Sequence, residues 1–182
     1  MSKALMTFAD GFEEVEALMT VDILRRGGVE VSLVSITDET EVTGSHGITV
    51  KMDGILKDQN IMEYDIIILP GGQPGTTNLG QSPEVKLSVM AMYGVKKWVA
   101  AICAAPTVFG QYGILSGKKA CCYPGLEEQL TGATVTYDKV TIDANVITSR
   151  GLGTALDFAL AILEQLTSTA KAAMIKKSVV AE

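Results

Sequence analysis

The sequence has few of the residues that mark disulfide-rich or metal-binding proteins. Its 182 residues include three cysteines and one histidine. An odd number of cysteines makes no complete disulfide framework, and the adjacent pair Cys121 and Cys122 is poorly placed to bridge itself. With one histidine and no C-x-x-C motif, the chain also lacks the ligand spacing of a zinc site. We therefore expect free thiols, a reducing compartment and no metal.

Basic residues and long apolar runs are scarce as well. Fifteen Lys and Arg residues stand against 21 Asp and Glu residues, which gives a formal net charge of −6. Such a chain offers no basic stripe for nucleic acid or for an anionic membrane. No apolar run approaches the ~18 residues that span a bilayer, and the run before Asp10 is too short for a signal-peptide core. These absences predict a cytoplasmic protein that acts on a small molecule or another protein.

The residues that are present predict one α/β domain over residues 1–182. Apolar residues make up 47% of the chain and charged residues 20%, as in a globular domain with a sizeable core. Short runs rich in β-branched residues alternate with helical patterns, which indicates a mostly parallel sheet with helices on both faces. We expect strands at residues 3–8, 29–36, 48–51, 66–69 and 98–102, with two or three more within 133–148. We expect helices at 13–26, 82–93, 105–112, 154–166 and 168–177.

Cys103 is the strongest candidate for a reactive residue. It follows an expected buried strand directly and precedes an expected helix, with small residues two positions before and after it. This is the layout of a nucleophile elbow, in which a cramped turn presents the reactive atom at the edge of the sheet. Helix-terminal N–H groups would lower the pKa of such a thiol. The alternative is a structural cysteine buried in the core.

Two further segments can contribute to the same edge of the sheet. Gly71 and Gly72 follow the strand at 66–69, and glycine lets backbone N–H groups approach a ligand as oxyanion donors, although the run also fits a plain turn. Glu16 lies on the helix face that carries Met19, Thr20 and Ile23 and should look toward the sheet. Burial there would raise the carboxyl pKa. The alternative is a solvated helix acid, which is the expected role of Glu13 and Glu14.

His46 is the only histidine, so any Cys–His dyad must use it. It lies between glycines in a polar loop, which favours a surface position over a catalytic one.

Four short blocks of the sequence together resemble the ThiJ/PfpI family, in the branch of the parkinsonism-associated deglycase and its bacterial relatives. The resemblance extends over nearly the whole chain and rests on residues 11–16, 69–72, 100–106 and 148–154. It implies a flavodoxin-like three-layer sandwich, usually a homodimer. In that family Cys103 matches the reactive cysteine, Glu16 matches the carboxyl that contacts its sulfur, and Gly72 and Ala104 match the backbone donors around it.

The sequence departs from the best-known member of this family at Tyr123-Pro124, where that protein has a histidine before the proline. Tyrosine is a poor base near neutral pH, which leaves open whether Tyr123 or His46 takes part in proton transfer. Neighbouring branches differ more, because Ala104 replaces the histidine of the peptidase branch and no histidine follows Cys103, as glutaminases require.

The resemblance implies a cofactor-free enzyme for reactive carbonyls, which turns methylglyoxal into lactate or removes glycation from thiols and amines. The alternative is an oxidative-stress sensor or chaperone that works through oxidation of Cys103 to the sulfinate. A third reading is a flavodoxin-like binding module with a structural cysteine.

Overall fold

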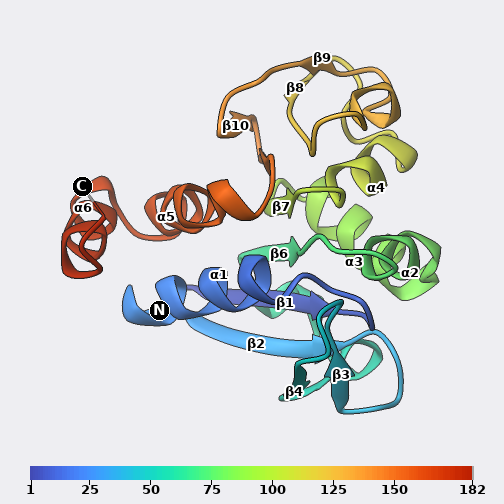
Figure 1. Cartoon of the computed structure of the whole chain (residues 1–182), viewed down its shortest axis with the longest axis horizontal. Helices are drawn as coiled ribbons and strands as arrows, with labels where there is room; N and C mark the ends of the chain where they lie inside the picture. Colours follow the sequence, from blue (N-terminus) through green and yellow to red (C-terminus); the bar gives the residue numbers. More distant parts are fainter. Residues whose placement is uncertain (182) are drawn as a thin grey trace.

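The computed structural model describes residues 1–181 and is organised around a 7-stranded sheet (Figure 1). Every neighbouring pair of strands in it is parallel except β10 and β11, which confirms the predicted mostly parallel sheet. In spatial order the strands are β10 (Val140–Asp143), β11 (Val146–Ser149), β7 (Trp98–Ile102), β6 (Ile66–Leu69), β1 (Lys3–Phe8), β2 (Glu30–Ser35) and β5 (Gly54–Ile55).

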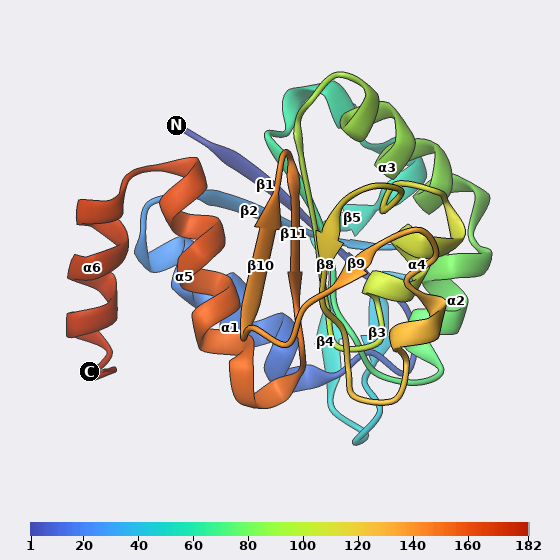
Figure 2. The same cartoon turned by 90° about the horizontal axis from the view of Figure 1, so that it is seen from above.

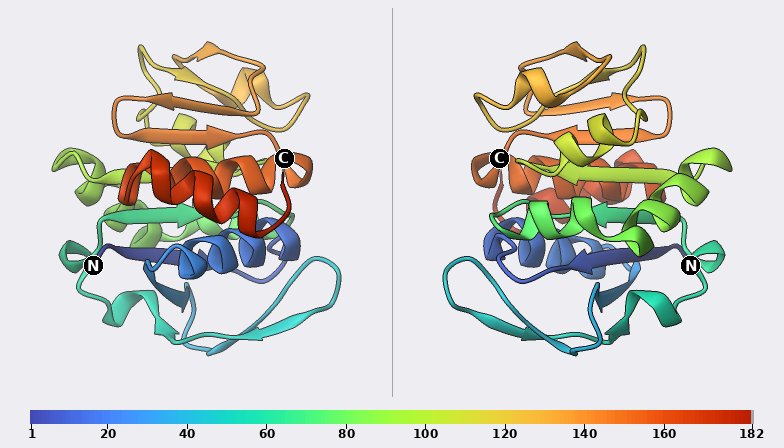
Figure 3. Two further views of the ribbon diagram at one scale, coloured as in Figure 1. Left: turned by 90° about the vertical axis from the view of Figure 1, so that its left-hand side faces the viewer. Right: turned by 90° about the vertical axis from the view of Figure 1, so that its right-hand side faces the viewer.

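Helices cover both faces of this sheet, which makes a three-layer flavodoxin-like sandwich (Figures 2 and 3). One face carries α1 (Glu14–Arg26), α5 (Ala155–Leu166) and α6 (Thr169–Ser178). The other carries α2 (Gly75–Gln81), α3 (Pro83–Gly94) and α4 (Pro106–Gln111). None of the helices within residues 1–181 is both long and apolar enough to cross a membrane.

The apolar core is divided into two clusters by the alternation of side chains along each strand. In β6, Ile66 and Ile68 face the helices α1 and α5, whereas Ile67 and Leu69 face α3 and α4. All four side chains are fully buried. A strand covered on both faces must be apolar at every position, which explains the unbroken run of isoleucine and leucine.

Helix starts agree with the chemistry of their caps. The Ser82 hydroxyl accepts a hydrogen bond from the N–H of Val85, and Pro83 occupies the first helical position of α3. The α1 helix begins at Glu14, one residue later than predicted. Glu13 is its cap and accepts from the N–H of Glu16.

The structure also contains short elements that the sequence pattern did not predict. The α2 helix begins at Gly75, just after the Pro-Gly-Gly run, in a stretch for which the sequence predicted no helix. The predicted strand at 48–51 is β4 (Thr49–Lys51), and it pairs with β3 (Glu41–Thr43) in a hairpin beside the sheet. A second small sheet pairs β8 (Lys119–Ala120) with β9 (Thr134–Val135). Two or three strands were expected within 133–148, and three are present as β9, β10 and β11, the last of which ends at Ser149.

Four adjacent parallel strands end side by side, and this sets the position of the candidate site. They are β11, β7, β6 and β1, which end at Ser149, Ile102, Leu69 and Phe8. In open α/β sheets, ligands bind beyond the carboxyl ends of such strands. The four sequence blocks singled out above begin within or soon after these four strands, so the fold brings them to one edge.

Candidate functional site

Cys103 lies at the edge where these strands end, in a strained backbone conformation. Its φ angle is 65°, in the left-handed region that residues other than glycine rarely adopt. Its N–H donates to the carbonyl of Ser149 at the end of β11, and its carbonyl accepts from the N–H of Tyr123. Both neighbouring segments therefore hold the Cys103 backbone. The thiol is half-buried. This geometry corresponds to a nucleophile elbow, and such strain persists only where surrounding contacts enforce it.

Glu16 lies directly beside this sulfur. Its side chain is 1% exposed, and the Gly71 N–H donates to Oε2 at 3.0 Å. The Cys103 sulfur lies beside the same carboxylate oxygen, because a Cβ atom on Gly71 would be 2.4 Å from Glu16 Oε2 and 3.1 Å from Cys103 Sγ. Burial raises the pKa of Glu16 to about 7, and the charge of Glu13 adds to this, while the hydrogen bonds from Cys103 and Gly71 oppose it. The position of Glu16 on the helix face that carries Met19, Thr20 and Ile23 predicted that its side chain would be buried.

The pKa of Cys103 moves in the opposite direction from the one predicted. Burial and the negative charge of Glu16 raise it to about 12, and hydrogen bonds from the N–H groups of Ala104 and Gly72 offset only part of this rise. The expectation of a thiol activated by a helix N-terminus was therefore wrong for the state in which Glu16 is ionised. A thiolate becomes favourable only when Glu16 holds the proton, because two adjacent negative charges in a buried place oppose each other.

Glycine is required at positions 71 and 72 by the close packing around the sulfur. A Cβ atom on Gly71 would lie 2.4 Å from Glu16 Oε2 and 2.5 Å from Cys103 Cβ. Gly72 has a φ of 92°, and a Cβ there would lie 2.3 Å from the backbone nitrogen of Glu13. The absence of both side chains lets the backbone approach the carboxyl and the thiol closely.

Tyr123 and Pro124 lie at the rim of the site. Both are exposed, and the Tyr123 ring borders Gly151, where an added Cβ would lie 3.4 Å from the ring and 3.9 Å from Glu16 Oε1. Tyr123 is therefore close to the carboxyl through the space that Gly151 leaves open.

His46 is exposed in the turn of the β3–β4 hairpin. Within residues 1–181 its side-chain hydrogen bonds go to Ser45 and Glu14, not to Cys103. Glu14 is the residue that the sequence reasoning misjudged, since it is not a plain solvated acid but is 3% exposed. Burial raises its pKa, but hydrogen bonds from the His46 side chain and from backbone N–H groups outweigh this and lower the pKa to about 2.

Glu13, Glu14 and His46 have ligand atoms within 4.8 Å of one another, a spacing that could hold a metal ion. The Glu14 oxygens are already engaged by donors from the hairpin, so we assign the cluster to structure.

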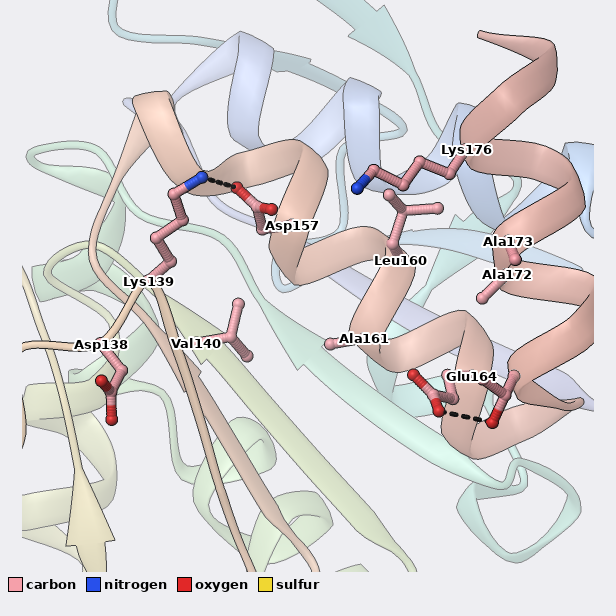
Figure 4. Close-up of a pocket in the computed structure, with 11 residues that line it drawn as sticks. Asp138, Lys139, Val140, Asp157, Leu160, Ala161, Glu164, Ala172, Ala173 and Lys176 are labelled. Carbon is pink, nitrogen blue, oxygen red and sulfur yellow. Dashed lines mark hydrogen bonds and ion pairs between the residues drawn. The ribbon is translucent and has the colours of Figure 1, made fainter. Parts of the chain in front are cut away.

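A groove of about 600 Å³ lies between β10, α5 and α6 (Figure 4). Lys139 pairs with Asp157 across it at 3.1 Å, and the Thr169 hydroxyl donates to Glu164. The lining residues come from none of the four sequence blocks, so the groove is separate from the Cys103 site.

The DJ-1/PfpI family model matches residues 2–165. The Parkinson disease protein 7 homolog of Danio rerio is 37% identical over 178 residues, which cover 96% of this chain and 94% of that protein. Protein DJ-1 homolog B of Arabidopsis thaliana is 40% identical over 172 residues, or 93% of this chain, but the chain spans only 39% of its length. A Caenorhabditis elegans relative named glutathione-independent glyoxalase is 37% identical over 161 residues, 87% of this chain and 85% of that protein. The solved structure of oxidized Toxoplasma gondii DJ-1 superposes with a TM-score of 0.95 at 32% identity and covers 99% of this chain and 98% of its own.

The strain at Cys103 predicts the relative stability of two variants that lack the thiol. Glycine adopts a positive φ without the steric cost of a Cβ atom, so Cys103→Gly should be more stable than Cys103→Ala by about 1 kcal/mol. Urea denaturation of both proteins measures this difference. Ala104→Gly is the matched control, because Ala104 is not among the residues with positive φ. It should lose stability, and a Cys103→Gly protein less stable than Cys103→Ala would contradict the strain.

Proposed function

The chain belongs to the DJ-1/PfpI family, and from this we propose that it detoxifies reactive carbonyls by cysteine catalysis without a cofactor, converting methylglyoxal to lactate. Family membership supports a stress-related function, and one relative is named a glyoxalase. The observation that carries the proposal is the close packing of the Cys103 side chain and the buried Glu16 carboxyl around Gly71, whose N–H donates to Glu16 Oε2.

The first step is addition of the Cys103 sulfur to the aldehyde carbon. Above pH 7 Glu16 is ionised and Cys103 holds its proton. The Glu16 carboxylate takes the thiol proton as the carbon–sulfur bond forms and returns it to the former carbonyl oxygen, which gives a neutral hemithioacetal. The Gly72 and Ala104 N–H groups stabilise the charge that develops on that oxygen.

The second stage moves hydrogen between the two carbons and then releases the product. Glu16, ionised again, removes the proton from the carbon that carries sulfur and delivers it to the neighbouring carbon, while the hydroxyl proton passes to the second oxygen. The product is a thioester, and water hydrolyses it to lactate and the free thiol. No external oxidant or reductant is consumed. The same addition to glycated thiols or amines would count as deglycation.

We expect lactate formation from methylglyoxal to depend on Cys103. The Cys103→Ala variant removes the attacking sulfur and leaves the fold intact, so its turnover should fall to the buffer rate. Chiral analysis of lactate over time measures this. Cys121→Ala is a control with wild-type turnover expected, because Cys121 is fully buried. Equal rates for wild type and Cys103→Ala would refute the enzyme.

The raised pKa of Glu16 predicts the pH dependence. The base form is required, so kcat/KM should rise as the pH increases through about 7 and level off above it. Glu16→Gln should lose about 10²- to 10⁴-fold in kcat and show no rise near pH 7. The measurement is a rate profile for both proteins. A Glu16→Gln enzyme that keeps the wild-type profile would exclude Glu16 as the base.

Oxidation of Cys103 is a second candidate function, and the uneven exposure of the thiols favours it. Cys103 is half-buried, whereas Cys121 and Cys122 are 0% and 2% exposed. Protonated Glu16 could donate to a sulfinate and stop oxidation at that stage. The oxidized Toxoplasma gondii relative has the same fold.

Hydrogen peroxide should therefore add two oxygen atoms to Cys103 and none to Cys121 or Cys122, as read by peptide mass spectrometry. Glu16→Gln should shift the product away from the sulfinate. The sensor idea fails if the variant gives an unchanged set of oxidation products.

A further inference from the structure

The buried Glu14 carboxylate fastens the turn of the β3–β4 hairpin to the start of α1. Oε1 accepts from the N–H of His46 at 2.7 Å and lies 3.5 Å from the N–H of Ile48. Oε2 accepts from His46 Nδ1 at 2.9 Å and from the Ser45 hydroxyl at 3.4 Å. These contacts all go to one turn, so removing the carboxylate would free the hairpin tip.

The hairpin is attached in turn to the loop that follows β1. The Gly11 N–H donates to the carbonyl of Thr43, and the Ser45 N–H donates to the carbonyl of Phe12, both at 2.8 Å. The Asp10 side chain accepts from the N–H of Thr43 at 2.9 Å. The hairpin thus supports residues 10–12 from outside the sheet.

The same loop holds the backbone donors of the site. The Glu13 N–H donates to the carbonyl of Gly71 at 2.9 Å, and the Gly75 N–H lies 3.2 Å from the carbonyl of Gly11. Gly72 packs against the backbone of Gly11 to Glu13, and the preceding Gly71 lies against Cys103, where an added Cβ would be 2.5 Å from the cysteine Cβ and 3.1 Å from its sulfur. A continuous path of contacts therefore joins Glu14, the hairpin, the loop and the thiol.

We propose that Glu14 is a positioning residue for Cys103, which acts by holding the β3–β4 hairpin against the loop that packs Gly71 and Gly72 beside the thiol. Within residues 1–181 the hydrogen bonds of the Glu14 carboxylate go to the hairpin turn and none goes to the thiol, so Glu14 acts through these contacts. The effect of Glu14 on lactate formation rests on the proposed function. Its effect on the reactivity of the Cys103 thiol does not.

His46 adds a charge to this attachment when it is protonated. Its hydrogen bond to Glu14 and the charge of Glu14 raise its pKa. The charged groups that act on His46 are Glu14 and Glu13 from the start of α1, and the neutral Ser45 hydroxyl is its neighbour in the turn. The raised pKa means that the charge is fully present below the unfolded value of 6.5 and is lost as the pH rises through the folded value.

The test is the rate at which iodoacetamide alkylates Cys103 in Glu14→Gln and Glu14→Ala. Weakening the Gly72 hydrogen bond removes a contact that lowers the thiol pKa, so alkylation at pH 8 should slow by about threefold in Glu14→Gln and more in Glu14→Ala. Lactate formation should lose about tenfold in kcat with little change in KM. Glu39→Gln is the matched control, an exposed acid beside the hairpin that should keep both rates.

Circular dichroism and thermal melts identify variants that are folded at the assay temperature, and Glu14→Gln serves if Glu14→Ala does not fold. A folded Glu14→Gln protein that alkylates at the wild-type rate overturns the proposal. If the wild type makes no lactate, the proposed function fails, while slower alkylation in Glu14→Gln still supports the positioning role.

Discussion

The burial of a single carboxyl group, Glu16, is the constraint on which the rest of the site depends. A buried carboxylate needs partners, and here they are the Gly71 N–H and the Cys103 thiol. The first partner requires that position 71 carry no side chain, because a Cβ there would overlap Glu16 Oε2. The second couples the protonation of two groups, so that a charge on one raises the pKa of the other. The strained turn at Cys103 follows from the need to bring sulfur to this carboxyl.

This coupling explains why one pair of residues is compatible with two functions. A carboxyl with a pKa of about 7 is a base for proton transfer between carbons when ionised and a donor to an oxidised sulfur when protonated. Both proposed functions use Cys103. The carbonyl enzyme would use ionised Glu16, and the peroxide sensor would use protonated Glu16.

Much of the fold could be predicted from the sequence because it is encoded locally. Unbroken apolar runs identify strands covered on both faces, and Ser82-Pro83 identifies a helix start. The four sequence blocks meet because they begin within or follow four neighbouring parallel strands. By contrast, α2 has two glycines, two threonines and an asparagine in seven residues, so its helical state depends on tertiary packing. The burial of Glu14 could not be foreseen either, since its partners lie more than 30 residues away in the hairpin turn. The thiol pKa depends on the charge of Glu16, which no local pattern contains.

The donors around the sulfur are main-chain groups of Gly72 and Ala104, and this affects how such a site changes during evolution. A backbone N–H survives every substitution except proline, but position 72 must also remain glycine, because its φ is 92° and a Cβ there would lie 2.3 Å from the backbone nitrogen of Glu13. The proposed chemistry therefore constrains Gly71 and Gly72 through their packing, and Cys103 and Glu16 through their side chains. Exposed neighbours such as Tyr123 are free to vary without loss of those donors. The rim of the site can thus change while the packing around Cys103 and Glu16 stays the same.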